Sequence, residues 1–214
     1  MTSFGGIPFE AVDFYEDLER DNSRDWWLAH RDRYDTAVRA PMAALAAALE
    51  PEFGTAKLFR PHRNLRFSAD KTPYKTHQGL VVATATRMGW YVQVSADGLM
   101  TSAGWYASSP DQLARYRRVL DDEAPAEALE TILDDLRAQE YAVGGGRLKT
   151  RPRGVPREHP FLELLRHRTL TVRREYGEPE WLPTPEVLDR VAADWRAYQP
   201  LIEWLAEHVG DAPA

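Results

Sequence analysis

The 214-residue chain contains no cysteine. That absence excludes disulfides, thiolate catalysis and every zinc or iron–sulfur site that depends on cysteine. Long hydrophobic runs are also missing, since the longest apolar stretch, 80–85, is far shorter than the about 20 residues that a membrane-spanning helix needs. The N-terminus has neither the basic nor the apolar region of a signal peptide. We therefore expect a soluble, cytoplasmic protein that does not enter a membrane.

Apolar residues are nevertheless plentiful enough for a core. Hydrophobic residues make up 43% of the chain and aromatic residues 11%, and a chain of this length suits one domain. We expect a single domain over 1–214. It should have a helical N-terminal part (1–56), a sheet core (57–106) and a mixed, mainly helical C-terminal part (107–214).

Helical spacing dominates the first 50 residues. Pro8 and Ser23 mark the starts of two helices, as helix-opening and N-capping residues do. Pro41 should kink or restart the second helix, and Pro51 should end it.

Strand signals follow. Short runs rich in Val, Thr and aromatic residues predict strands at 80–86, 90–95 and 99–105. Asp97-Gly98 is typical of a hairpin turn, because glycine readily takes a positive φ. We expect segment 57–68 to join this antiparallel sheet as its first strand.

Helices return after the strands. A capping box at 109–112 predicts one helix, apolar spacing predicts another around 129–136, and Thr184-Pro185 opens a long final helix. The proline-rich stretch 151–160 should be irregular. Helices on both sides of a block of strands predict an α+β fold, in which a central antiparallel meander is flanked by N-terminal and C-terminal helices.

Positive charge is concentrated in two segments of an acidic chain. Residues 57–75 hold six Lys/Arg and one Asp, a charge of +5 where the whole chain carries -6. Residues 147–174 hold nine Lys/Arg and two Glu, a charge of +7. The rest of the chain is strongly acidic and opposes general nucleic-acid binding, so a pocket for one small anion fits this distribution better.

The two basic segments supply the predicted site. On a strand, Arg60 and Arg66 would share a polar face, whereas Arg63 would point to the apolar side and need a partner. Guanidinium groups match phosphate and carboxylate. The second segment would close the pocket. The predicted ligand-binding residues are Arg60, Arg63, Arg66, Ser68, Asp70, Lys71, Tyr74, Lys75, Lys149 and His159.

Catalysis is not required by any motif. The sequence has no H-E-x-x-H, Walker A or G-x-S-x-G pattern, and we expect neither a metal site nor a cofactor. A catalytic version of the pocket would use His159 or Tyr74 for proton transfer, with the Arg/Lys cluster stabilising negative charge.

Two other readings of the basic motif remain open. It could be an interaction surface for nucleic acid or an acidic protein, since aromatic and basic residues interleave around Phe59, Phe67 and Tyr74. It could also be a buried ion-pair network that fixes the loop 68–77 on the sheet.

The residues 63–76, RNLRFSADKTPYKT, carry a longer pattern. They resemble the R-D-x-R-F-S-x-D-K-x-P-Y-K motif of an uncharacterised, mainly bacterial family, domain of unknown function 2461. The segment 22–27, the run 104–106 and the stretch 148–160 are similar to further landmarks of that family. The resemblance covers about residues 4–168. It implies a fold and a site, with no function to carry over.

One position departs from the family motif. The family usually has Asp where this chain has Asn64. An amide neither ionises nor holds a divalent cation strongly. Either the position is structural in the family, or this chain has lost an activity.

Overall fold

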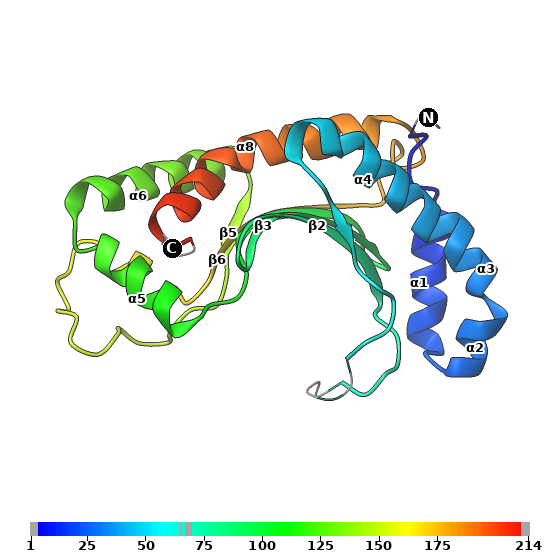
Figure 1. The fold of residues 1–214 in the computed structure, drawn as a ribbon, viewed down its shortest axis with the longest axis horizontal. Coiled ribbons are helices and arrows are strands. Elements are labelled where there is room, and N and C mark those ends of the chain that lie inside the picture. Colours follow the sequence, from blue (N-terminus) through cyan, green and yellow to red (C-terminus); the bar gives the residue numbers. More distant parts are fainter. Residues whose placement is uncertain (1–3, 65, 67–69, 211–214) are drawn as a thin grey trace. The chain divides into compact units, whose positions relative to one another are not determined.

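The computed structural model describes residues 4–64, 66 and 70–210, in which helices accompany a six-stranded antiparallel sheet (Figure 1). The strand order is β1-β2-β3-β4-β6-β5. The strands are β1 (Lys57–Leu58), β2 (His77–Ala85), β3 (Met88–Ser95), β4 (Gly98–Trp105), β5 (Ala142–Gly144) and β6 (Leu170–Gly177). The predicted α+β class is confirmed.

The chain forms two compact units. Unit 1 comprises residues up to 82, 91–101 and 175–193, and unit 2 comprises 83–90, 102–174 and the residues from 194 on. Unit 1 contains α1 (Glu10–Arg20), α2 (Arg24–Ala29), α3 (Arg31–Arg33), the π-helical turn η1 (Tyr34–Arg39) and α4 (Ala40–Phe53). Unit 2 contains α5 (Pro110–Val119), α6 (Glu123–Ala138) and α7 (Leu162–Leu165). The residues of α8 (Glu186–His208) are divided between the units.

The helices of unit 1 begin much as the sequence predicts. The Ser23 side chain accepts a hydrogen bond from the Trp26 backbone and so caps α2. Pro51, however, lies inside α4, so the prediction that it ends the helix is wrong. A proline in the last turn removes few helical bonds, and the helix ends only at Gly54, whose φ of 93° an L side chain rarely adopts.

A π-helical turn precedes Pro41. The Ala40 N–H donates to the Asp35 carbonyl five residues back, which is the π-helical pattern. Pro41 has no N–H with which to continue an α-helical ladder from the preceding turn. The backbone stays helical from Arg39 through Ala40 into α4, so the irregularity at the predicted kink or restart is a π turn followed by α4.

The strands of the meander are confirmed, but the predicted first strand is too long. Among the described residues of 57–68, only β1 forms a strand with β2, with Lys57 opposite Val81 and Leu58 opposite Leu80. Pro61 cannot donate to a ladder, and the chain leaves the sheet there. The prediction also missed β5 and β6, which pair antiparallel. Apolar and polar residues alternate clearly only at the start of β6, because charged residues follow Val172.

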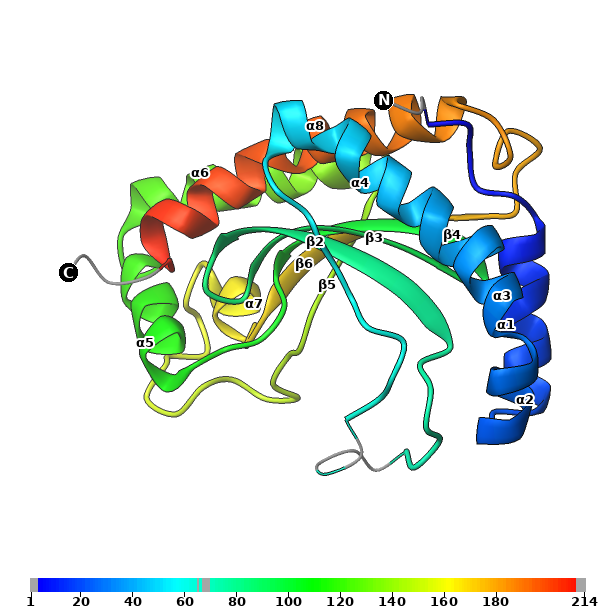
Figure 2. The ribbon, with the colours of Figure 1, turned by 45° about the vertical axis from the view of Figure 1, so that its right-hand side comes forward.

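Aromatic side chains form much of the core in each unit. In unit 1, Phe14, Trp27 and Tyr34 are almost fully buried and their rings lie 4.8–5.8 Å apart. Figure 2 shows α4 passing over the strands of this unit. In unit 2, Trp105 and Tyr116 are fully buried with ring centroids 5.6 Å apart. No helix among the described residues is both long and apolar enough to cross a membrane.

Candidate functional site

The basic motif forms an arm that leaves the sheet. Residues 59–64 and 70–76 run antiparallel, and Figures 1 and 2 show them extending together from the strands. The Arg63 N–H donates to the Pro73 carbonyl and the Lys75 N–H donates to the Pro61 carbonyl, both at 2.8 Å. These two bonds pair the outgoing and returning segments of the arm. Pro61 and Pro73 contribute only their carbonyl acceptors to this pairing.

The base of the arm is held against α2. Asn22 accepts a hydrogen bond from the Tyr74 N–H and donates one to the Tyr74 carbonyl, each at 3.1 Å. The Tyr74 ring stacks on Trp27, with centroids 4.1 Å apart and planes 9° apart. Only 5% of Tyr74 and 4% of Trp27 is exposed. These contacts fix the arm relative to the helices of unit 1.

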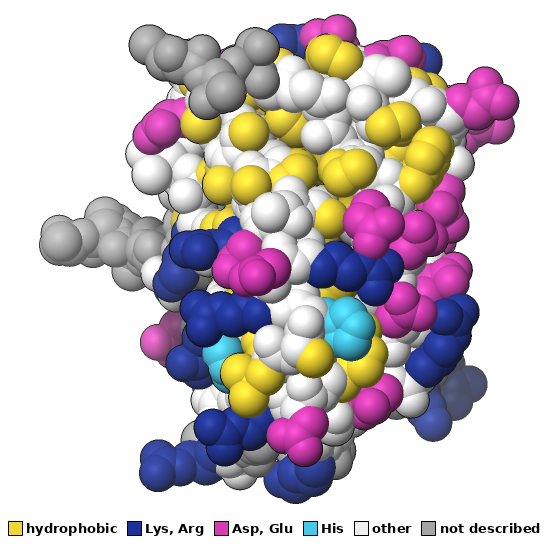
Figure 3. All heavy atoms as spheres, turned by 90° about the vertical axis from the view of Figure 1, so that its right-hand side faces the viewer, with side chains coloured by type: hydrophobic (Ala, Val, Ile, Leu, Met, Phe, Trp, Pro, Cys, Tyr) yellow, Lys and Arg dark blue, Asp and Glu magenta, His cyan; other side chains and the backbone are white. Residues whose placement is uncertain are grey.

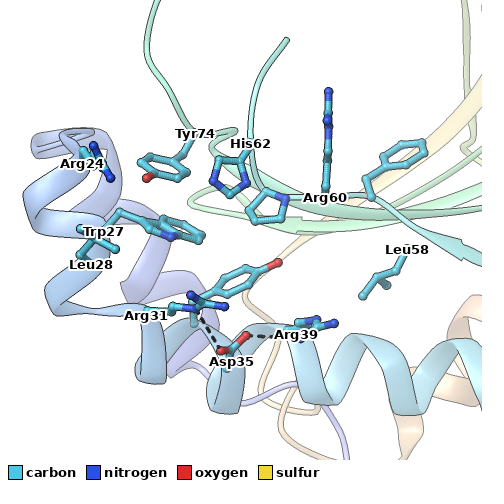
Figure 4. Close-up of a pocket in the computed structure, with 13 residues that line it drawn as sticks. Arg24, Trp27, Leu28, Arg31, Asp35, Arg39, Leu58, Arg60, His62 and Tyr74 are labelled. Carbon is cyan, nitrogen blue, oxygen red and sulfur yellow. Dashed lines mark ion pairs between the residues drawn. The ribbon is translucent and has the colours of Figure 1, made fainter.

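A pocket of about 540 Å³ opens between the arm and the helices (Figure 4). The helical wall comes from α2, α3 and η1, and the facing wall comes from β1 and the arm. Its lining residues are Arg24, Trp27, Leu28, Arg31, Tyr34, Asp35, Arg39, Leu58, Phe59, Arg60, Pro61, His62 and Tyr74. Four arginines and one carboxylate therefore share one cavity.

Asp35 neutralises only part of the positive charge of the four arginines. It lies 3.7 Å from a guanidinium nitrogen of Arg31 and 3.7 Å from one of Arg39, as the dashed lines of Figure 4 mark. Neither Arg24 nor Arg60 forms an ion pair within 4–64, 66 and 70–210. Figure 3 looks onto the side that carries α1–α3 and shows Lys and Arg side chains gathered with histidine in its lower half.

Burial and neighbouring cations both lower the pKa of Lys75. Partial burial lowers the pKa of Lys75, and the positive charges of Arg60 and Arg63 lower it further. The same physical causes act on His77, whose pKa is lowered by burial and by Lys75 and Arg63. Burial is the main cause at both residues, and neighbouring cations add to it.

Hydrogen bonds tie the two walls of the pocket together. The Tyr34 hydroxyl of η1 donates to the Gln78 side chain at 2.5 Å, and the Gln78 amide donates to the Phe59 carbonyl at 2.8 Å. Burial raises the pKa of Tyr34 to about 12, so its phenol keeps its proton at neutral pH. The π turn also carries Asp35 and Arg39, and such turns are frequent at functional sites.

The predicted residues of the first segment have different surroundings. Arg60 and Tyr74 line the pocket. Arg63 pairs with Asp70 at 3.0 Å, so its predicted need of a partner is confirmed. Asp70 also accepts two hydrogen bonds from Thr72, which together with Arg63 lower the pKa of the Asp70 carboxyl.

Three further residues of the motif are exposed or lie against the arm. The Lys75 ammonium lies 4.9 Å from the centroid of the Phe59 ring. Arg66 and Lys71 are exposed. Ser68 lies outside the described residues. Their part in ligand binding stays a prediction.

The second basic segment belongs to unit 2. His159 accepts a hydrogen bond from the Phe161 backbone at 3.1 Å. Arg166 donates to the carbonyls of Leu148 and Lys149 at 3.1 and 3.0 Å, which orders the loop that carries Lys149. A joint site of Lys149 and His159 with the arm stays a prediction.

The helical wall of the pocket was missed. Arg24, Arg31 and Arg39 are spaced by seven and eight residues, which places them along one face of a helix. Trp27 and Tyr34 have the same helical spacing beside them. The apolar periodicity of this segment does not indicate the row of arginines, because the arginines border the buried face.

Removing the Asn22 side chain should loosen the base of the arm. We expect Asn22→Ala to lower the free energy of unfolding by about 1–2 kcal/mol, because two partly buried backbone groups of Tyr74 lose their partner. Urea unfolding measures this loss. Asn64→Ala is the control, since Asn64 is exposed and its side chain accepts one bond, from the Arg66 N–H at 3.3 Å. Equal stability of the two variants would contradict the clamp.

Metal ligands do not cluster in the part of the chain that the structure describes, where no group of three His, Asp or Glu residues could hold an ion.

A family model described as conserved hypothetical protein, DUF2461, matches residues 10–204. Among proteins with curated descriptions, none matches the chain.

Proposed function

This chain belongs to the DUF2461 family of conserved hypothetical proteins, and we propose that it binds a small organic anion, bearing phosphate or carboxylate, in the pocket of unit 1. Arg60 of the arm and Arg24 of α2 bind the charged group. Arg31 and Arg39 add positive potential from the helical wall.

One observation carries this proposal: the pocket contains more cations than its own carboxylate can neutralise. Four arginines line it, and Asp35 is the acidic residue among the lining side chains. Guanidinium groups bind phosphate and carboxylate through paired N–H donors. A cavity of about 540 Å³ also lies within the size range of small-molecule sites.

Internal ion pairs account for other arginines of unit 1, but they do not account for Arg24 and Arg60. Arg33 bridges to Glu10 and to Asp17, at 2.7 Å to the latter, and 24% of its side chain is exposed. Arg63 likewise forms an ion pair with Asp70. Arg24 and Arg60 are exposed and have no such carboxylate among the described residues, so internal ion pairing does not account for them.

A thermal-shift screen with nucleotides, sugar phosphates and organic acids tests the proposal. We expect one class to raise the melting temperature and to bind saturably in calorimetry. Arg60→Ala should weaken that binding about tenfold, which corresponds to the loss of one charge-assisted contact. Arg118→Ala, an exposed arginine of α5, is the control and should leave the affinity unchanged. Saturable binding of none of these anions would overturn the proposal.

Asp35 allows a test of opposite sign. We expect Asp35→Asn to tighten anion binding about threefold to tenfold, because it removes a negative charge from the pocket while keeping the size of the side chain. Raising the salt concentration should reduce this gain. Asp32→Asn, in neighbouring α3 and outside the pocket lining, should change the affinity little. Weaker binding by Asp35→Asn would instead mean that Asp35 contacts the ligand, contrary to the proposed role.

A further inference from the structure

We infer that the anion bound in this pocket carries an apolar group next to its charged group, as in an alkyl or aryl phosphate or carboxylate. The inference rests on the proposed function, because it assigns the ligand class of the same pocket. It concerns the apolar part of the lining, which a hydrated inorganic anion would leave unused.

Leu28 is the first observation. It is 56% exposed, one of the few large hydrophobic residues with so much exposed surface among those described. A single exposed leucine needs no explanation on its own. Leu28, however, lines the pocket and follows Arg24 by one helical turn, so the two side chains lie on the same face of α2. Figure 4 shows both at the α2 end of the pocket.

The facing wall provides the second observation. Leu58, Phe59 and Pro61 line the pocket and are each half-buried, so part of their apolar surface remains open to solvent. All three lie within two residues of Arg60 in the chain. Each wall therefore places apolar surface beside an arginine, and a ligand with both characters would cover the two together.

Aliphatic contact, more than ring stacking, should supply the apolar affinity. The Trp27 and Tyr74 rings stack on each other and are 4% and 5% exposed, so they offer little open face. One face of the Phe59 ring carries the Lys75 ammonium at 4.9 Å. The affinity gained from the apolar group should follow its buried area, so cyclohexyl and phenyl phosphate should bind about equally.

Calorimetry with inorganic phosphate, phenyl phosphate and cyclohexyl phosphate tests the inference. We expect both organic phosphates to bind the wild-type chain about tenfold more tightly than inorganic phosphate. Leu28→Gln should remove most of this difference. Tyr106→Gln is the control, because Tyr106 is 57% exposed and does not line the pocket.

The possible outcomes distinguish failure of this inference from failure of the proposed anion binding. Equal affinity of wild type for the three probes, lost in Arg60→Ala, would overturn the inference and leave anion binding intact. Tighter binding of organic phosphates that Leu28→Gln does not affect would also overturn it. Saturable binding of neither these probes nor the screened anions would overturn both.

A lipid could present the same chemistry, since phosphatidic acid carries a phosphate monoester on apolar chains. Flotation with phosphatidylcholine vesicles, with and without phosphatidic acid, distinguishes the sources. Soluble organic phosphates that bind without flotation would support a free ligand. Flotation that needs phosphatidic acid and is lost in Leu28→Gln would support the same chemistry in a lipid. Flotation equal in wild type and Leu28→Gln, without soluble binding, would overturn the inference.

Discussion

Replacing Trp27 with alanine is expected to lower the free energy of unfolding by about 3–5 kcal/mol, the usual loss for a buried tryptophan. Trp27 is 4% exposed, and its ring stacks on Tyr74 at 4.1 Å and lies 4.8 Å from Tyr34. Its removal would open a cavity between α2 and the arm. Because Tyr74 anchors the arm that carries Arg60, anion binding should weaken as well. Urea unfolding measures the first effect and calorimetry the second.

The neighbouring tryptophan is a matched control for this prediction. Trp26 is only half-buried and stacks on the imidazole of His30, with ring centroids 4.1 Å apart. Trp26→Ala should therefore lose less stability, about 1 kcal/mol, and leave the arm in place. If the two alanine variants unfold at the same urea concentration, Trp27 does not hold the arm as described.

The second large effect is expected at Asp194 in unit 2. Its carboxylate accepts a hydrogen bond from the Tyr141 hydroxyl at 2.9 Å and pairs with Arg174 at 3.3 Å. Only 2% of the Asp194 side chain is exposed, whereas 30% of the Arg174 side chain is. We expect Asp194→Ala to lower the free energy of unfolding by about 3 kcal/mol, because a buried hydroxyl and a guanidinium lose their shared acceptor. Thermal and urea unfolding measure the loss.

Further variants separate the contributions at Asp194. Asp194→Asn keeps an oxygen for the Tyr141 hydroxyl and removes the charge, so its loss should be intermediate. Glu203→Ala, an exposed acidic residue of the same helix, should change stability little. Arg174→Ala combined with Asp194→Ala should cost less than the sum of the single variants. Additive losses would show that the pair is not coupled.

Local sequence signals succeeded where the deciding interactions are short-range. The Ser23 cap, the capping box at 109–112 and the strands of the meander each depend on neighbouring residues, and each is confirmed. Pro51 was misjudged because a proline late in a helix is tolerated when Gly54 provides the end. β6 was missed because its charged residues obscure the alternation of a strand, and its neighbours in the sheet, β4 and β5, lie elsewhere in the sequence.

The candidate site could be predicted only in part. Charge clustering drew attention to Arg60 and Tyr74, both of which line the pocket. Both Arg60 and Arg63 were predicted to bind the ligand, and only Arg63 was predicted to need a partner. Asp70 pairs with Arg63, whereas no carboxylate among the described residues pairs with Arg60. Burial and pairing distinguish two identical side chains, and neither is visible in composition.

The sequence by itself determined the α+β class, the family and the position of a basic motif, because periodicity, turn residues and local charge are properties of neighbouring residues. The tertiary structure alone decided which cations face a cavity. Asn22 and Trp27 hold Tyr74 from about 50 residues away in the chain, and that contact sets the arm opposite the row of Arg24, Arg31 and Arg39. Such pairing depends on packing between distant segments, which no local pattern records.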